Sequence, residues 1–228
     1  MSSQTQVELC YWPIKYRCEY IRWLLAYLKV DFKETFPRDA NEWALMKTKL
    51  SPLNPLVNLP FLRDSASEKV ISETDAIAFA IALRYGGKEL LGKDGAEIIM
   101  HRSIQEQLKT IREFALKCFE YNRADLIKLF DIVCEERVVP KLRYMDNLKR
   151  LDYRFLIGAP TVADFELTHI IQILDYVAAN TGLRNPIVDF PNLYQIADNV
   201  KALQGVGQYI RANEQRPWHF QQMTKFLN

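Results

Sequence analysis

The hydrophobic pattern changes along the chain, and this change restricts the fold more than any other feature. In the first third, short runs in which apolar and polar residues alternate lie between amphipathic stretches with helical spacing. Later segments show helical periodicity alone. Strands are predicted at 6–12, 30–36, 59–62 and 69–72, and helices at 18–28, 41–50 and 74–85. Strands that alternate with helices over about 80 residues form an α/β unit. The sequence therefore predicts an α/β N-terminal domain followed by an all-α C-terminal domain.

A glycine-rich stretch separates the two patterns. Four glycines stand at positions 86, 87, 92 and 95, and the first pair ends the preceding helix, since glycine readily caps a helix in the left-handed conformation. We therefore predict a first domain at 1–87, a linker at 88–95 and a helical domain at 96–228. Within the helical domain, residues 165–177 are apolar nearly all round, which indicates a helix at the domain centre.

Composition excludes several classes of protein. The formal net charge of +2 is too small for a nucleic-acid-binding surface. The longest uninterrupted apolar run, Ala76 to Leu83, is far shorter than the roughly 20 residues of a membrane helix, and residues 1–6 lack signal-peptide features. The four cysteines (Cys10, Cys18, Cys118 and Cys134) form neither a disulfide framework nor a zinc pattern. A reduced, cytoplasmic protein without a metal site, a membrane anchor or a nucleic-acid partner is expected.

Most catalytic motifs are missing. The chain has no phosphate-binding loop, no dinucleotide glycine pattern and no nucleophile elbow, and without Cys-x-x-Cys a glutaredoxin-like reductase is excluded. His169 lies in the most apolar helix and is interpreted as a hydrogen-bonded core or interface residue rather than a catalytic one. Cys18 lies near the start of a helix, where its pKa could be lowered, but it also occupies the apolar stripe, and core packing is the favoured alternative.

The segment 11–25, Tyr-Trp-Pro-Ile-Lys-Tyr-Arg-Cys-Glu-Tyr-Ile-Arg-Trp-Leu-Leu, is the most informative part of the chain. Tyr11 ends the first strand at a strand-to-helix junction, where α/β folds place ligands, and Arg17 follows near the start of the helix. This segment resembles the first strand and helix of the cytosolic glutathione transferases of the tyrosine type. The Tyr11-Trp12 pair is similar to the mu class, whereas residues 17–25 are closer to the alpha and sigma classes.

Further motifs extend the resemblance along nearly the whole chain, in the order that the family requires. Asn-Leu-Pro-Phe-Leu at 58–62 resembles the family's cis-proline strand, and Glu-Thr-Asp-Ala-Ile at 73–77 resembles the helix start that holds the γ-glutamyl end of glutathione. Phe-Pro-Asn-Leu at 190–193 resembles the entry to a late helix. Thr-Val-Ala-Asp-Phe at 161–165 resembles the family's capping box, and here the residue chemistry agrees, because a threonine three residues before an acid satisfies free N–H groups.

The resemblance implies a thioredoxin-like first domain with a mixed four-stranded sheet, and a homodimer. It implies an enzyme of detoxification that joins the glutathione thiolate to small, apolar electrophiles, with glutathione as co-substrate and no cofactor. Tyr11 would be catalytic, and Tyr121 in the helical domain is the candidate wall of the electrophile pocket. The residues implied to bind glutathione are Trp12, Arg17, Trp43, Lys47, Asn58, Leu59, Pro60, Glu73 and Thr74.

The implied roles agree with physical chemistry. A hydrogen bond from Tyr11 to the glutathione sulfur favours the thiolate, which is the nucleophile, and Arg17 would add positive charge beside it. Thr74 and the free N–H groups at the start of its helix suit the γ-glutamyl carboxylate, and Glu73 could accept from the α-amino group. The backbone of Leu59, made available by a cis bond at Pro60, would pair with the cysteinyl backbone.

Several positions depart from the family's pattern. Tyr16 replaces a glycine next to the ligand, Pro13 replaces an acid or amide, and Ala40 replaces a basic residue. Arg102 aligns with an aspartate that reaches the partner's glutathione, and Leu56 replaces an aromatic residue that docks into the partner. These departures leave an alternative open, namely a weakly active or inactive transferase-like subunit that acts as a scaffold in a larger assembly.

Three of the implied glutathione ligands also have an alternative interpretation. Trp12 and Trp43 could be core aromatics, and Lys47 could be a solvated surface residue.

Overall fold

Four short strands form one mixed sheet in the order β2-β1-β3-β4. They are β1 (Val7–Cys10), β2 (Phe32–Thr35), β3 (Phe61–Asp64) and β4 (Val70–Ser72). Strand β1 is parallel to β2 and antiparallel to β3, which is antiparallel to β4. This mixed, four-stranded, thioredoxin-like sheet confirms the fold expected for the N-terminal part. The third strand begins at Phe61, two residues later than predicted, because residues 58–60 form the turn before it.

The computed structural model describes residues 7–64, 69–86, 88–148, 153–220 and 223–227. The expectations that rest on residues 1–6 and on Gly87 lie outside the described residues.

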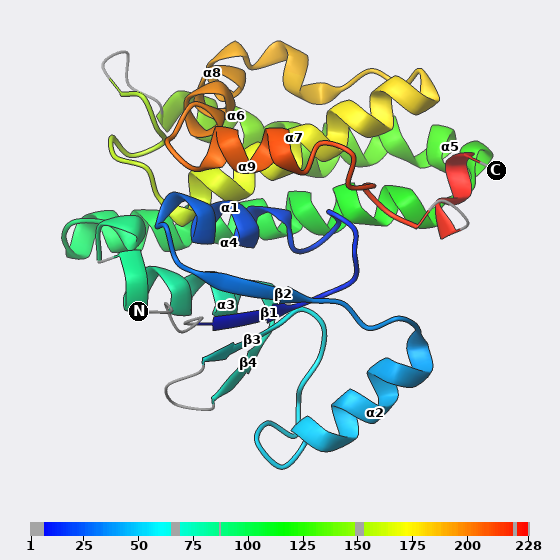
Figure 1. Ribbon diagram of the computed structural model, residues 1–228. Helices are drawn as coiled ribbons and strands as arrows, with labels where there is room; N and C mark the ends of the chain where they lie inside the picture. The colour runs from blue at the N-terminus through cyan, green and yellow to red at the C-terminus, as the bar shows by residue number, and fades with distance from the viewer. Residues whose placement is uncertain (1–6, 65–68, 87, 149–152, 221–222, 228) are drawn as a thin grey trace.

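Helices cover both faces of the sheet (Figure 1). Helix α2 (Ala40–Leu50) lies on one face, where Trp43 packs against a small cluster that includes Cys10 and Phe61. Helices α1 (Glu19–Tyr27) and α3 (Thr74–Ile81) lie on the other face, toward the helical part of the chain. Because successive strand residues point to opposite faces, Leu9 joins the large core on this second side.

Beyond the sheet, the described chain is mostly helical, as expected. The α-helices are α4 (Gly95–Lys117), α5 (Arg123–Val133), α6 (Val139–Leu148), α7 (Val162–Thr181), α8 (Pro191–Lys201) and α9 (Val206–Ala212). Short π- and 3₁₀-helical turns precede α4 at Ala82–Gly86 and Lys88–Leu91, and another follows α9 at Lys225–Leu227. Further turns lie between the helices at Cys118–Glu120, Cys134–Val138 and Pro186–Asp189. The segment predicted as a linker thus contains a 3₁₀ turn, and its Leu90 and Leu91 are buried because they pack into the large core. The domain boundaries themselves stay a prediction.

Helix α7 is the central helix of this part, as its apolar sequence predicts. It packs against α4, α8 and α1, so it contacts both the helical part and the N-terminal part. A capping box starts it, because Asp164 accepts hydrogen bonds from the backbone N–H and the hydroxyl of Thr161, both at 2.8 Å. The same buried carboxylate also accepts from the backbone N–H of Leu156 at 2.8 Å. This one side chain therefore orders both the helix start and the loop before it.

We expect Asp164→Ala to lower the free energy of unfolding by about 2–4 kcal/mol, because it leaves buried donors without an acceptor. Asp94→Ala is the matched control, since Asp94 caps α4 through two backbone N–H groups at an exposed position and should cost only about 1 kcal/mol. Urea unfolding of both variants measures the difference. Equal losses would contradict the role given to burial.

Burial also decides the protonation state of His169 on α7. Its ring is fully buried among Tyr20, Trp23 and Trp218, with ring centroids 5.9, 6.0 and 6.0 Å away. This desolvation lowers the pKa of His169 to about 3. The ring is therefore a neutral core group, which agrees with the expected core role, although neither ring nitrogen has a hydrogen-bond partner among the described residues.

A pH dependence of stability follows. His169 is protonated in the unfolded chain below about pH 6.5 but stays neutral in the folded protein down to about pH 3, so acid favours unfolding in this window. We expect this group to remove about 2 kcal/mol of stability between pH 7 and pH 5. His169→Phe should therefore lose less stability over that range, measured by urea unfolding at each pH. Parallel curves for the two proteins would refute this assignment.

Candidate functional site

Tyr11 follows the last residue of β1 and is 4% exposed. Its backbone N–H donates to Thr35 O at 3.2 Å, which continues the pairing with β2 by one residue. Burial raises the pKa of the Tyr11 hydroxyl well above its usual range, and a hydrogen bond from the backbone of Arg17 opposes this only in part. The hydroxyl is therefore protonated at neutral pH and suited to donate a hydrogen bond rather than to act as a base.

A cavity of about 250 Å³ lies beside this junction, between Arg17 and the start of α3. Six residues line it, and each is among those implied to bind glutathione: Arg17, Asn58, Leu59, Pro60, Glu73 and Thr74. Segments that are distant in the sequence thus meet at one site, as the motifs predict. Tyr11 itself does not line the cavity, but its hydroxyl accepts a hydrogen bond from the backbone of Arg17, which does.

The backbone around this cavity has two unusual features. The Leu59–Pro60 peptide bond is cis, as the resemblance implies, and the backbone N–H of Asn58 donates to Ser72 Oγ at 3.1 Å. Glu73 has a φ of 71°, which is uncommon for any residue except glycine and recurs at functional sites. Glu73 makes no side-chain hydrogen bond to cap α3. The first N–H groups of α3 therefore face the site without a capping side chain, which suits a carboxylate.

Arg17 brings positive charge to the cavity, but it shares this charge with Glu113. Its guanidinium forms a two-pronged ion pair with that carboxylate on α4, at 2.7 and 3.0 Å. Arg17 also lines a larger hollow of about 620 Å³ between α3 and α4, together with Phe79 and Arg102. The two hollows meet at Arg17, Glu73 and Thr74.

A buried ionic cluster fixes the start of α3. Nη1 of Arg112 on α4 lies 2.6 Å from Asp75 Oδ1 and 2.6 Å from Glu166 Oε1 on α7. It also donates to the hydroxyl of Tyr20 on α1 at 3.2 Å. Burial would raise the pKa of Asp75, but Arg112 outweighs it and holds that pKa below its usual range. Asp75 directly follows Glu73 and Thr74, so this cluster positions one wall of the cavity.

Three other implied ligands lie elsewhere. Trp43 stacks on Phe61 at 6.3 Å within the cluster under α2, in agreement with its core alternative. Lys47 is exposed in the last turn of α2, and Trp12 makes an edge contact with Phe220 at 6.0 Å. None of the three lines the 250 Å³ cavity. Their proposed contacts with glutathione stay predictions.

Tyr16, which stands where the family has glycine, does not line the cavity. Its ring packs against Phe119 at 5.7 Å and His219 at 4.7 Å, and its hydroxyl donates to Leu116 O at 3.3 Å. A φ of 23° at Tyr16 turns the chain so that the ring enters the helical part. Tyr121 follows the 3₁₀ turn Cys118–Glu120 and packs at the margin of the core.

Cys18 is a core residue. It is fully buried, and this burial raises its pKa to about 12, so the alternative of a reactive thiol is not supported. All four cysteines are free and buried. Among the described residues, no group of three or more histidine, cysteine or acidic side chains is arranged to hold a metal ion. No helix in the described ranges is long and apolar enough to cross a membrane.

Arg112, Glu113 and Glu166 belong to this region although no motif predicts a site role for them. One signal was available, because Glu166 lies between Phe165 and Leu167 on the predicted central helix, and a buried carboxylate requires a compensating partner. The partner could not be chosen from the sequence, since Arg112 is 54 residues away.

Comparisons with known proteins agree with this arrangement. Residues 7–82, which hold the sheet, the cavity lining and the first three helices, match the family described as "Glutathione S-transferase, N-terminal domain". A glutathione S-transferase of Tyrophagus putrescentiae is 28% identical over 217 residues, which cover 90% of each chain. Residues 7–82 are thus similar to the N-terminal domain of the glutathione S-transferases, and the chain is similar, over nine-tenths of its length, to one glutathione S-transferase.

Proposed function

We propose that this protein is a glutathione transferase of the tyrosine type, which joins the glutathione thiolate to a small, apolar electrophile. The observation that carries the proposal is the cavity whose six lining residues are all implied glutathione ligands. The free N–H groups of α3 suit the γ-glutamyl carboxylate, and the turn at Leu59 offers backbone groups for pairing with the cysteinyl residue. Glutathione is the co-substrate, and no cofactor is required.

The proposed chemistry is stabilisation of a thiolate. The protonated hydroxyl of Tyr11 would donate to the glutathione sulfur, and the adjacent guanidinium of Arg17 would favour the negative charge. The thiolate then attacks the electrophilic carbon, a carbon–sulfur bond forms, and the leaving group departs with its electron pair. An electrophile would approach from the helical part, with Tyr121 as the candidate wall. Conjugation of this kind is a reaction of detoxification.

Removal of the Tyr11 hydroxyl tests this role. We expect Tyr11→Phe to raise the thiol pKa of bound glutathione by about one to two units, because a hydrogen bond to a charged group contributes about 1.5–3 kcal/mol. Turnover should fall about 10- to 100-fold at neutral pH, while the affinity for glutathione changes little. The measurements are ultraviolet titration of the thiolate, calorimetric titration with glutathione, and conjugation of a chromogenic aryl halide.

Two further variants make this test specific. Tyr194→Phe is the matched control, because its hydroxyl bonds to Asp175 on α7 far from the cavity. Arg17→Met removes the cation that lines the cavity and keeps the hydroxyl of Tyr11, so it measures the contribution of the charge alone. Normal turnover in Tyr11→Phe together with a loss in Arg17→Met would show that the cation stabilises the thiolate. If the unmodified protein does not bind millimolar glutathione, the scaffold alternative replaces the enzymatic one.

We also propose that the protein is a homodimer that associates through α3 and the start of α4. Large apolar side chains are exposed there: Phe79 is 48%, Leu83 52% and Ile99 73% exposed. Exposed apolar surface of this extent next to a groove is typical of a protein interface. Leu56, which replaces the family's aromatic docking residue, is 82% exposed and available for insertion into a partner.

We expect Phe79→Asp to convert a dimer into a monomer, because a charge in an apolar interface costs several kcal/mol of desolvation. Ile132→Asp is the control, since Ile132 is 54% exposed on α5, outside the proposed interface. Analytical ultracentrifugation measures both. A monomer in the unmodified protein, or dissociation by Ile132→Asp alone, would contradict the proposed interface.

A further inference from the structure

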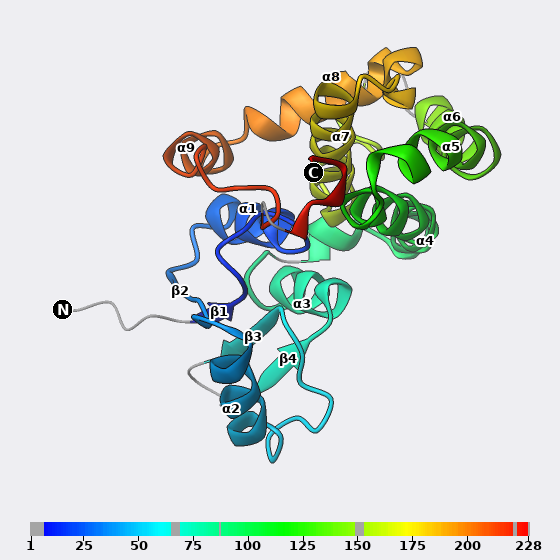
Figure 2. The same ribbon diagram turned by 90° about the vertical axis from the view of Figure 1, so that its right-hand side faces the viewer.

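The C-terminal segment 213–220 returns to the loop 12–17, which connects Tyr11 with α1. The backbone N–H of Lys15 donates to Pro217 O at 2.8 Å, and that of Tyr16 donates to Trp218 O at 3.0 Å. In Figure 2 this red segment passes beside α1. Two segments about 200 residues apart in the sequence are therefore paired through their backbones next to the candidate site.

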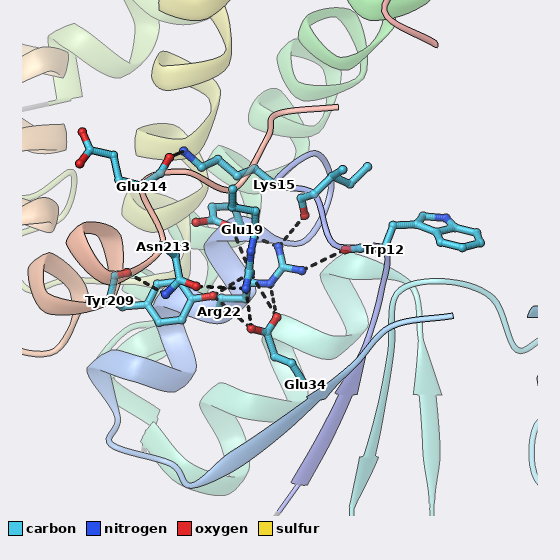
Figure 3. Close-up of polar contacts among 10 residues, drawn as sticks. Trp12, Lys15, Glu19, Arg22, Glu34, Tyr209, Asn213 and Glu214 are labelled. Atoms are coloured by element: carbon cyan, nitrogen blue, oxygen red, sulfur yellow. Dashed lines mark hydrogen bonds and ion pairs between the residues drawn. The ribbon is translucent and has the colours of Figure 1, made fainter. Parts of the chain in front are cut away.

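One carboxylate connects this segment to the sheet. Arg216 donates to both oxygens of Glu34 on β2, at 3.2 and 2.7 Å. The same guanidinium donates to the hydroxyl of Tyr209 at 2.8 Å and to Asn213 Oδ1 at 3.1 Å. Figure 3 shows the carboxylate of Glu34 directed from the strand toward Arg22, with Tyr209 and Asn213 in the same cluster.

Arg22 links Glu34 to the loop 12–17 by hydrogen bonds. It is fully buried on α1, and its Nε donates to Glu34 Oε1 at 2.6 Å. Its Nη1 donates to Ile14 O at 2.8 Å and to Glu19 Oε2 at 3.1 Å, and its Nη2 donates to Trp12 O at 3.3 Å, so two of these bonds reach carbonyls of the loop. A continuous chain of charge-assisted hydrogen bonds thus runs from Arg216 through Glu34 and Arg22 to the loop. Figure 3 shows the part of this chain from Glu34 through Arg22 to Trp12.

The electrostatics favour a charged Glu34. Burial alone would raise its pKa, but the guanidinium groups of Arg22 and Arg216 outweigh this and hold the pKa below its usual range. Without Arg216, the carboxylate would keep Arg22 but lose its contact with the C-terminal segment. Charge-assisted hydrogen bonds of this kind are about twice as strong as neutral ones. Removing Arg216 would therefore weaken the attachment of the C-terminal segment to the sheet and the loop.

The loop lies between the two side chains proposed to stabilise the thiolate. Tyr11 directly precedes it, Arg17 ends it, and the backbone of Arg17 bonds to the Tyr11 hydroxyl. A small displacement of residues 12–17 would therefore move both groups, whereas Asn58, Leu59 and Thr74 belong to other segments.

We propose that Arg216 is a positioning residue, which holds the C-terminal segment on the loop 12–17 through Glu34 and so keeps Tyr11 and Arg17 aligned on the glutathione sulfur. The inference rests on the proposed function and deepens it. Arg216 does not touch the substrate in this role. Its effect reaches the reaction through the loop, and the ligands for the ends of glutathione are left in place.

The experiment compares Arg216→Gln and Arg216→Lys with the unmodified protein. For Arg216→Gln we expect the thiol pKa of bound glutathione to rise by about one unit and kcat to fall about tenfold below that pKa, with the glutathione affinity changed less than about threefold. Lysine restores the charge and should recover most of kcat. Arg184→Ala is the control, because it removes an exposed ion pair with Asp189 away from the loop.

Each outcome decides between the alternatives. An unchanged thiol pKa in a folded Arg216→Gln variant, or an equal loss in Arg184→Ala, overturns the positioning role. Loss of affinity without a change in thiol pKa indicates a merely structural role and also overturns it. If Arg216→Gln does not fold, Asn213→Ala removes one bond to Arg216 and should raise the thiol pKa in the same direction, and no change refutes the role. Absence of a thiolate in the unmodified protein instead overturns the proposed function, and the inference falls with it.

Discussion

The arrangement of this protein depends on the requirement that a buried guanidinium must be paired. Arg112 has a side chain only 4% exposed, and it lies within 2.6 Å of carboxylates on α3 and α7. Removing one partner of such a buried pair typically costs about 3–5 kcal/mol, because the remaining charge stays desolvated. Helices α3, α4 and α7 are therefore held in one relative position, and the sheet cannot shift against the helical part without exposing or isolating this charge.

A second buried guanidinium, that of Arg22, also holds a segment beside the candidate site in place. Arg22 fixes the loop after β1, whereas Arg112 fixes the start of α3 through Asp75. The cavity lies between these two anchored segments, with Arg17 on one wall and Thr74 on the other. Two desolvated arginines thus explain why a site built from a loop, a turn and a helix end has a defined shape. Preorganisation of this kind is what stabilisation of a thiolate requires.

Much of the fold and part of the site could be predicted from the sequence. The pattern before Gly86 predicts the strands and helices of the first part to within a few residues, whereas the helical periodicity after Gly95 predicts a helical second part with a central helix but not the bounds of each helix. The capping box of Thr161 and Asp164 was predicted because its signal is local. The six cavity residues follow from three short motifs. Trp43 and Lys47 show the limit, since a residue's place in a motif does not tell whether helix α2 turns its side chain toward the cavity, the sheet or solvent.

What the sequence determined by itself is therefore the set of elements, their order and the residue types available at the strand-to-helix junction. These properties depend on spacing and on contacts between near neighbours. Only the tertiary structure decided which buried charges pair, because Arg112 meets Glu166 across 54 residues and Glu34 meets Arg216 across 182. No local pattern selects such partners. They are chosen when apolar surfaces pack together and leave each buried charge one set of neighbours that can compensate its desolvation.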